Sequence, residues 1–289
     1  MKFSITTFTL GLLLAGTSIS FGPDAKSHRV LFLGNSVFLS GGGLCQSFEG
    51  FCKAAGLDYQ AVSQNNTSAN LHGIEFLDFG RIPLSLPEIA AKDEIHSLIR
   101  SGQFDYVILE GRRPGYLLPA WVELPDNFGQ HIPYEQNVAA LGGIHRTIVE
   151  SGAQTVLYMH PGSHMFADTK HPLAQIYLRL HCDLEKMEIK GERHDVTLVP
   201  ASLLWLDALK RYGIEGWYAD RFHGTSLARY TSACMLYTYL TGKDPRENKF
   251  RELPRTWQTP PEEPSVYVSE EDAKWIKDQV WLYYSTRPR

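Results

Sequence analysis

The sequence predicts an α/β protein in which a parallel five-stranded sheet lies between two layers of helices. Two observations support this class. Short apolar runs alternate along the chain with longer segments of helical periodicity, and glycines or other turn residues separate them. This alternation implies right-handed βαβ units, which place the strands in one parallel sheet and cover both of its faces with helices.

The individual elements can be placed in order along the chain. Apolar runs of strand length occupy residues 30–33, 59–62, 106–109, 155–159 and 196–199. Helical spacing covers residues 44–55, 87–100, 135–150, 172–190, 201–212, 226–240 and 270–284. Gly56 and Gly242 follow two of these helices and are predicted to end them. A proline-rich stretch, 254–264, leads to the last helix.

Length and composition indicate one globular domain. The chain has 289 residues, of which 43% are hydrophobic and 21% charged, so it can form a folded core and is not a membrane bundle. We expect a single domain over residues 21–289. The net charge of −4 gives no reason to expect nucleic acid or anionic lipid as a partner.

The first 20 residues are typical of a secretory signal peptide. Lys2 precedes an apolar run over residues 8–15, and Ser18 and Ser20 resemble the small residues of a cleavage site. The run is short for a membrane span, although an uncleaved anchor stays open. We therefore expect a secreted or periplasmic protein, without stable membrane insertion after the signal is cleaved.

An exported protein could oxidise its four cysteines, which permit three complete pairings. Cys45 and Cys52 lie seven positions apart in a predicted helix, farther than a disulfide normally reaches. We expect this pair, and Cys234 in its apolar helix, to be buried thiols.

Two short motifs suggest a family. Gly34-Asn35-Ser36 follows the first predicted strand, and Asp220 and His223 lie three residues apart just before a helix near the end of the chain. In this order the motifs resemble those of the SGNH/GDSL hydrolase superfamily. They resemble most a bacterial branch in which the motif around the serine reads Gly-Asn-Ser. The resemblance covers about residues 30–245 and implies a flavodoxin-like α/β/α fold and a serine esterase.

The chemistry of the three residues agrees with that resemblance. A serine hydroxyl becomes a strong nucleophile when a base takes its proton, and a carboxylate can orient the base and stabilise its cation. Ser36 is the expected nucleophile, His223 the base and Asp220 the orienting group. Alternatively, Ser36 only caps the following helix and His223 is an ordinary loop residue.

The oxyanion hole is less defined. The resemblance implies one donor after the second strand, where Ser68 and Asn70 are candidates, and an Asn after the third strand. The chain has no Asn there: it reads Glu110-Gly111-Arg112-Arg113, so Glu110 or Arg113 occupies the place of the expected amide. The third donor stays open. We expect Glu110 to pair with one of the two arginines, since an unpaired carboxylate would oppose a developing oxyanion.

Residues after the third strand are candidates for substrate binding. Arg112, Tyr116 and Trp121 begin a segment rich in proline and glycine that reaches position 133. A guanidinium and aromatic rings could recognise an anionic or sugar group, although plain packing explains aromatic residues equally well.

A metal site has weaker support. His160, His164 and His171 recur after the fourth strand, and imidazole suits zinc, but Pro161-Gly162 interrupts helical spacing and no carboxylate cluster accompanies them. We expect neither a metal nor a cofactor.

The sequence therefore predicts an exported serine esterase acting on a small ester, with an O-acyl group on a carbohydrate as the preferred substrate. A glycan-binding protein on a decayed hydrolase fold is the alternative, and acyl transfer to a polymer would use the same residues.

Overall fold

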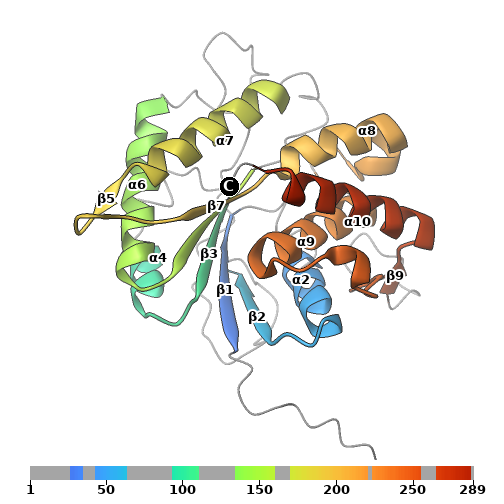
Figure 1. Cartoon of the computed structure of the whole chain (residues 1–289), viewed down its shortest axis with the longest axis horizontal. Coiled ribbons are helices and arrows are strands. Elements are labelled where there is room, and N and C mark those ends of the chain that lie inside the picture. The colour runs from blue at the N-terminus through green and yellow to red at the C-terminus, as the bar shows by residue number, and fades with distance from the viewer. Residues whose placement is uncertain are drawn as a thin grey trace, which may run out of the picture.

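The central sheet has five parallel strands, as predicted. In a computed structural model of the chain, residues 27–34, 43–63, 93–110, 134–159, 170–220, 223–254 and 265–287 are described. The strands are β1 (His28–Leu33), β2 (Tyr59–Ser63), β3 (Tyr106–Glu110), β4 (Gln154–Tyr158) and β7 (Val196–Val199). Their spatial order is β2-β1-β3-β4-β7, which is the flavodoxin-like order, and every neighbouring pair is parallel (Figure 1).

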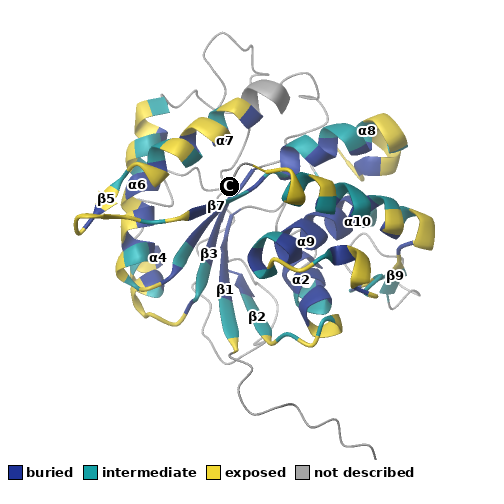
Figure 2. Ribbon diagram, viewed as in Figure 1, coloured by how far each residue is buried: buried dark blue, intermediate teal, exposed yellow. Residues whose placement is uncertain are grey.

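Helices cover both faces of the sheet. One face packs against α2 (Gly43–Ala54) and α9 (Ser226–Thr241), and the other against α4 (Asp93–Arg100), α6 (Tyr134–Glu150) and α7 (Lys170–Glu185). The last helix, α10 (Glu270–Ser285), packs on α9. Successive residues of β1 explain this arrangement: Val30 and Phe32 belong to the first core, whereas Leu31 and Leu33 belong to the second. The strands and α9 are the most deeply buried elements (Figure 2). The fold is therefore a three-layer α/β/α sandwich.

The predicted glycine stops are confirmed. Gly242 is the C-cap of α9 with φ of 69°, and Gly56, two residues after the end of α2, has φ of 70°. Residues with a side chain rarely adopt this left-handed conformation, so glycine ends both helices at low cost.

Two helix boundaries differ from the prediction. The helix predicted over 172–190 ends at Glu185 and is followed by a hairpin of β5 (Glu188–Ile189) and β6 (Glu192–Arg193). Lys190 and Gly191 both have positive φ, which a helix cannot accommodate. The helix predicted over 201–212 continues as α8 (Ala201–Trp217), with a break at Gly213, where φ is 70°.

The C-terminal part adds a short hairpin beside α2. A 3-10 turn, η3 (Pro245–Glu247), leads to β8 (Glu252–Pro254), which pairs antiparallel with β9 (Ser265–Tyr267). The proline-rich stretch 255–264 lies outside the described residues. Among the described helices, none is long and apolar enough to cross a membrane. The predicted signal segment, residues 1–20, is also outside the described part of the chain.

The prediction of buried thiols is confirmed for all three cysteines to which it applied. Cys45, Cys52 and Cys234 are buried thiols without a disulfide, and burial raises their pKa. Cys182 on α7 is an exposed thiol.

A buried histidine in the second core makes stability depend on pH. His145 on α6 is fully buried, and its Nδ1 lies 2.8 Å from Thr155 Oγ1 on β4. Burial, assisted by the nearby His194, lowers the pKa of His145 to about 4. Below pH 6.5 this histidine is protonated in the unfolded chain but stays neutral in the folded chain. The free energy of unfolding therefore decreases as pH falls from about 6.5 to about 4.

We therefore expect His145→Gln to flatten the acid side of the stability curve. The wild-type protein should lose about 3 kcal/mol more than the variant between pH 7 and pH 4, because the folded pKa is about 2.5 units below the usual value. Urea unfolding at several pH values measures this difference. Parallel curves for the two proteins would contradict it.

Candidate functional site

Asp220 and His223 form a hydrogen-bonded pair in the loop between α8 and α9. Asp220 Oδ2 lies 2.6 Å from His223 Nδ1, and Asp220 Oδ1 accepts a hydrogen bond of 2.8 Å from the backbone N–H of His223. One carboxylate therefore holds both the backbone and the imidazole of the histidine. The two side chains stay accessible, with 40% of Asp220 and 21% of His223 exposed, so a ligand can reach the imidazole.

Backbone hydrogen bonds between residues 217–219 and residues 223–225 close this loop, and we call these residues the Asp220–His223 clip. Tyr218 and Gly224 form an isolated antiparallel bridge. The N–H of Ala219 donates to the carbonyl of His223 at 2.8 Å, and the N–H of Thr225 donates to the carbonyl of Trp217 at 3.0 Å. Below the clip, Trp205 on α8 makes edge-on contacts with Trp217 and Tyr218, whose ring centroids lie 5.6 and 5.3 Å away. The loop is thus anchored to a small aromatic core.

This arrangement suits a general base. A carboxylate that accepts from Nδ1 favours the tautomer with hydrogen on Nδ1, in which the lone pair is on Nε2. The carboxylate also stabilises the imidazolium that forms when Nε2 takes a proton. The pair has the geometry that a nucleophile-activating dyad requires.

Gly224 fits the clip only because it lacks a side chain. A Cβ there would lie 2.6 Å from Ala228 Cβ and 2.7 Å from the ring of Trp205. We expect Gly224→Ala to lower the free energy of unfolding by about 1–3 kcal/mol through overpacking, and to weaken any activity that needs His223. Urea unfolding measures the first effect. Gly143→Ala on α6 is the control, because its new Cβ would meet nothing within 4 Å; equal effects at both positions would contradict this view.

The loop lies at the carboxyl edge of the sheet. Tyr158, the last residue of β4, donates a hydrogen bond of 2.8 Å to Ser232 Oγ on α9. The first turn of α9 also meets the start of α2, where Arg229 packs on Gly43. Because α2 follows β1 and α9 follows the clip, the helix N-termini and the dyad gather at the edge where α/β folds place their sites.

Most of the other predicted site residues lie outside the described residues. These are Ser36, Ser68, Asn70, Arg112, Arg113, Tyr116 and Trp121, together with His160, His164 and the side chain of His171. Glu110 is described: it ends β3, is fully buried and pairs in register with Tyr158 of β4. Within the described parts of the chain, no group of three or more His, Cys, Asp or Glu residues is arranged to hold a metal ion.

Arg229 was not among the residues predicted for the site. This arginine is only 9% exposed and lies in the first turns of α9, the helix that the sequence indicated as apolar. The available signal was the cation itself, six residues after His223 in an otherwise apolar segment.

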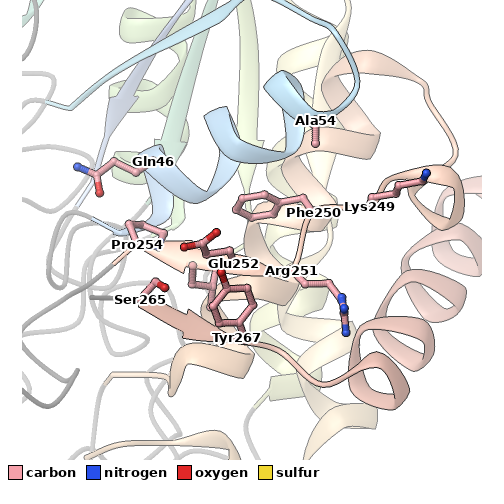
Figure 3. Close-up of a pocket in the computed structure, with 10 residues that line it drawn as sticks. Gln46, Ala54, Lys249, Phe250, Arg251, Glu252, Pro254, Ser265 and Tyr267 are labelled. Carbon is pink, nitrogen blue, oxygen red and sulfur yellow. The ribbon is translucent and has the colours of Figure 1, made fainter. Parts of the chain in front are cut away.

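A groove on the outer side of α2 is separate from this site. It lies between α2 and the β8–β9 hairpin, and its lining residues do not include any residue of the Asp220–His223 clip (Figure 3). Tyr267 and Glu252 face each other across the hairpin, and a hydrogen bond to Glu252 raises the pKa of the Tyr267 hydroxyl.

Two solved structures share this architecture. The crystal structure of the acetyl xylan esterase AlAXEase aligns with a TM-score of 0.50 and 13% identity, over 73% of this chain and 98% of that chain. Axe2, an acetylxylan esterase from Geobacillus stearothermophilus, aligns with a TM-score of 0.50 and 14% identity, over 78% of this chain and 96% of its own. No protein-family model matches the chain, and no curated protein does. These likenesses establish the fold, which this chain shares with two esterases.

Proposed function

We propose that this protein is a serine esterase in which Ser36 is the nucleophile, His223 the general base and Asp220 the residue that orients the base. The observation that carries the proposal is the Asp220–His223 pair, held by two hydrogen bonds and accessible at the carboxyl edge of the sheet. Ser36 follows the end of β1 by three residues, which limits its distance from that edge to about 11 Å of extended chain.

The reaction proceeds through an acyl-enzyme. Ser36 Oγ attacks the ester carbonyl while His223 Nε2 takes the hydroxyl proton, and Asp220 stabilises the resulting imidazolium. The alcohol leaves with that proton, and the acyl group stays on Ser36. Water then attacks the acyl-enzyme with His223 again as base, which releases the acid and restores the serine. Ser68, Asn70 and backbone N–H groups are the proposed donors to the oxyanion.

An O-acyl group on a carbohydrate is the proposed substrate. The two solved structures described above are named as acetyl xylan esterases. The predicted signal peptide agrees with an exported enzyme that meets glycans outside the cytoplasm, and Arg112, Tyr116 and Trp121 are proposed to contact the sugar.

The experiment that tests this function uses the full chain and aryl acetates of increasing acyl length. We expect 4-nitrophenyl acetate to be hydrolysed faster than longer esters, and a fluorophosphonate to label Ser36. Ser36→Ala is the control for both measurements. Turnover that persists in Ser36→Ala at the wild-type rate would exclude the proposed nucleophile.

Glu110 favours a second candidate, a glycan-binding protein on a decayed esterase fold. A fully buried carboxylate stands where the resemblance implies a neutral amide. If Glu110 pairs with Arg112 or Arg113, the negative charge is kept from the oxyanion and the enzyme is active. We then expect Glu110→Gln to keep activity within about threefold of the wild type, a change of under 1 kcal/mol in the barrier.

Steady-state rates of Glu110→Gln and Arg113→Ala on 4-nitrophenyl acetate distinguish the two candidates. Arg113→Ala should lower the rate more, because it exposes the oxyanion to the carboxylate. A large gain in Glu110→Gln with no change in Arg113→Ala would favour the decayed esterase.

A further inference from the structure

Arg229 is a buried guanidinium that has no counter-charge among the described residues. The side chain is 9% exposed, and among the described residues no carboxylate forms an ion pair with it. Its one side-chain hydrogen bond among these residues runs from Nη2 to Ser226 Oγ at 3.2 Å, whereas Nε is buried without a hydrogen-bond partner. Burial alone lowers the pKa of Arg229 to about 10, so the group remains a cation at neutral pH.

Retaining such a charge is costly. Buried cations in proteins are normally paired or fully hydrogen-bonded, because removing a charge from water costs several kcal/mol. A methionine or leucine would fill the same place in this apolar helix without that penalty. Packing alone therefore does not explain why an arginine occupies this position, and a binding role does.

The guanidinium lies where two helix N-termini meet. Its hydrogen bond to Ser226 shows that the side chain reaches back toward the start of α9. Its Cδ, Nη1 and Nε would lie 2.7 to 2.9 Å from a Cβ at Gly43, so the group covers the first residue of α2. Neither helix has an acidic residue in its first turn. Two positive helix ends and one cation thus converge on one point.

This point is close to the candidate site. His223 precedes Thr225, the N-cap of α9, and the N–H of Arg229 donates to the carbonyl of Thr225 at 3.0 Å. Because the guanidinium bonds Ser226, three residues after His223, a group bound to Arg229 lies at the same end of α9 as the proposed base.

We propose that Arg229 binds a carboxylate of the substrate, so that the preferred esters carry a negative charge next to the scissile bond. The carboxylate belongs either to the acyl group, as in a succinyl half-ester, or to the sugar, as in an acetylated uronate. A guanidinium recognises a carboxylate with two parallel hydrogen bonds, and Nε is one of its donors. This inference rests on the proposed esterase function and narrows its substrate class.

The test compares charged and neutral esters of matched structure. One pair is mono-(4-nitrophenyl) succinate and 4-nitrophenyl butyrate, and the other is acetylated methyl glucuronoside and acetylated methyl glucoside. We expect the wild-type protein to prefer the charged member of one pair, which identifies the source of the carboxylate. In Arg229→Met the ratio of charged to neutral kcat/KM should fall about 10- to 100-fold, mainly through KM, as loss of a charge-assisted hydrogen bond predicts.

Two further variants keep the test decisive if Arg229→Met does not fold. Arg229→Lys keeps the charge and should retain part of the preference. Gly43→Ala leaves the arginine intact but displaces its guanidinium, and it should lower the same ratio. Arg146→Met and Gly143→Ala, two exposed positions on α6, are the matched controls and should leave the ratio unchanged.

A binding measurement separates this inference from the esterase proposal. Calorimetric titration of the full chain with sodium succinate and sodium glucuronate should show binding of one anion, which Arg229→Met abolishes, whether or not any ester is hydrolysed. Hydrolysis of 4-nitrophenyl acetate without preference for a charged ester, and without binding of either anion, would overturn the role of Arg229 and leave the esterase proposal standing. Anion binding without turnover of any ester would overturn the esterase proposal alone.

Discussion

His223→Ala should lower ester turnover by about 10⁴-fold or more, because the members of a serine–histidine–aspartate triad act as one unit. Without the imidazole no group takes the proton of the proposed nucleophile, and Ser36→Ala should lower turnover to a similar extent. The losses should not add, so the double variant should be no slower than either single variant. Hydrolysis of 4-nitrophenyl acetate, with protein purified from an esterase-free host, measures all three rates.

The fold should tolerate the loss of His223. Its side chain is partly exposed, and a hydrogen bond joins it to Asp220, which is more exposed still. We expect the Tm of His223→Ala to stay within about 3 °C of the wild type, as for a surface substitution. His194→Ala, which removes another partly exposed loop histidine, is the matched control and should leave turnover unchanged. Equal activity in His223→Ala and His194→Ala would remove His223 from the reaction.

Asp220→Asn should lower turnover by about 10⁴-fold at neutral pH while the clip keeps its shape. An asparagine can still accept the hydrogen bond from the backbone N–H of His223. Its amide group, however, donates toward Nδ1, which favours the tautomer with hydrogen on Nε2 and removes the lone pair that the reaction needs. The effect should appear in kcat, because the carboxylate acts on the base and not on the bound ester.

The control for this variant is Asp278→Asn. Asp278 forms a surface ion pair with Lys274 on α10 and belongs to no part of the site. It should leave both kcat and KM unchanged. If Asp220→Asn retains wild-type kcat, the hydrogen bond between Asp220 and His223 has no catalytic role, and the proposed triad is wrong.

Local patterns in the sequence were sufficient to predict the strands of the sheet and the proximity of Asp220 to His223. A buried strand such as 106–109 depends on a run of apolar residues, and Gly56 and Gly242 end helices because only glycine easily adopts positive φ. Asp220 and His223 are three residues apart, so a turn alone can bring them together. The prediction of a helix over 172–190 was too long, because Lys190 and Gly191 with positive φ form the tip of a hairpin and not part of a helix.

Long-range packing decided the rest. Arg229 and Gly43 are 186 positions apart, and no periodicity links them. Only the packing of α9 against α2 places the guanidinium on the first residue of α2 and excludes a side chain there. Burial of that charge is likewise a property of the assembled helices, since the same arginine on an isolated helix would be hydrated. The sequence by itself therefore determined the fold class and the candidate dyad. Only the tertiary structure could decide that a cation is buried between the starts of α9 and α2, because its environment is built from segments distant in the chain.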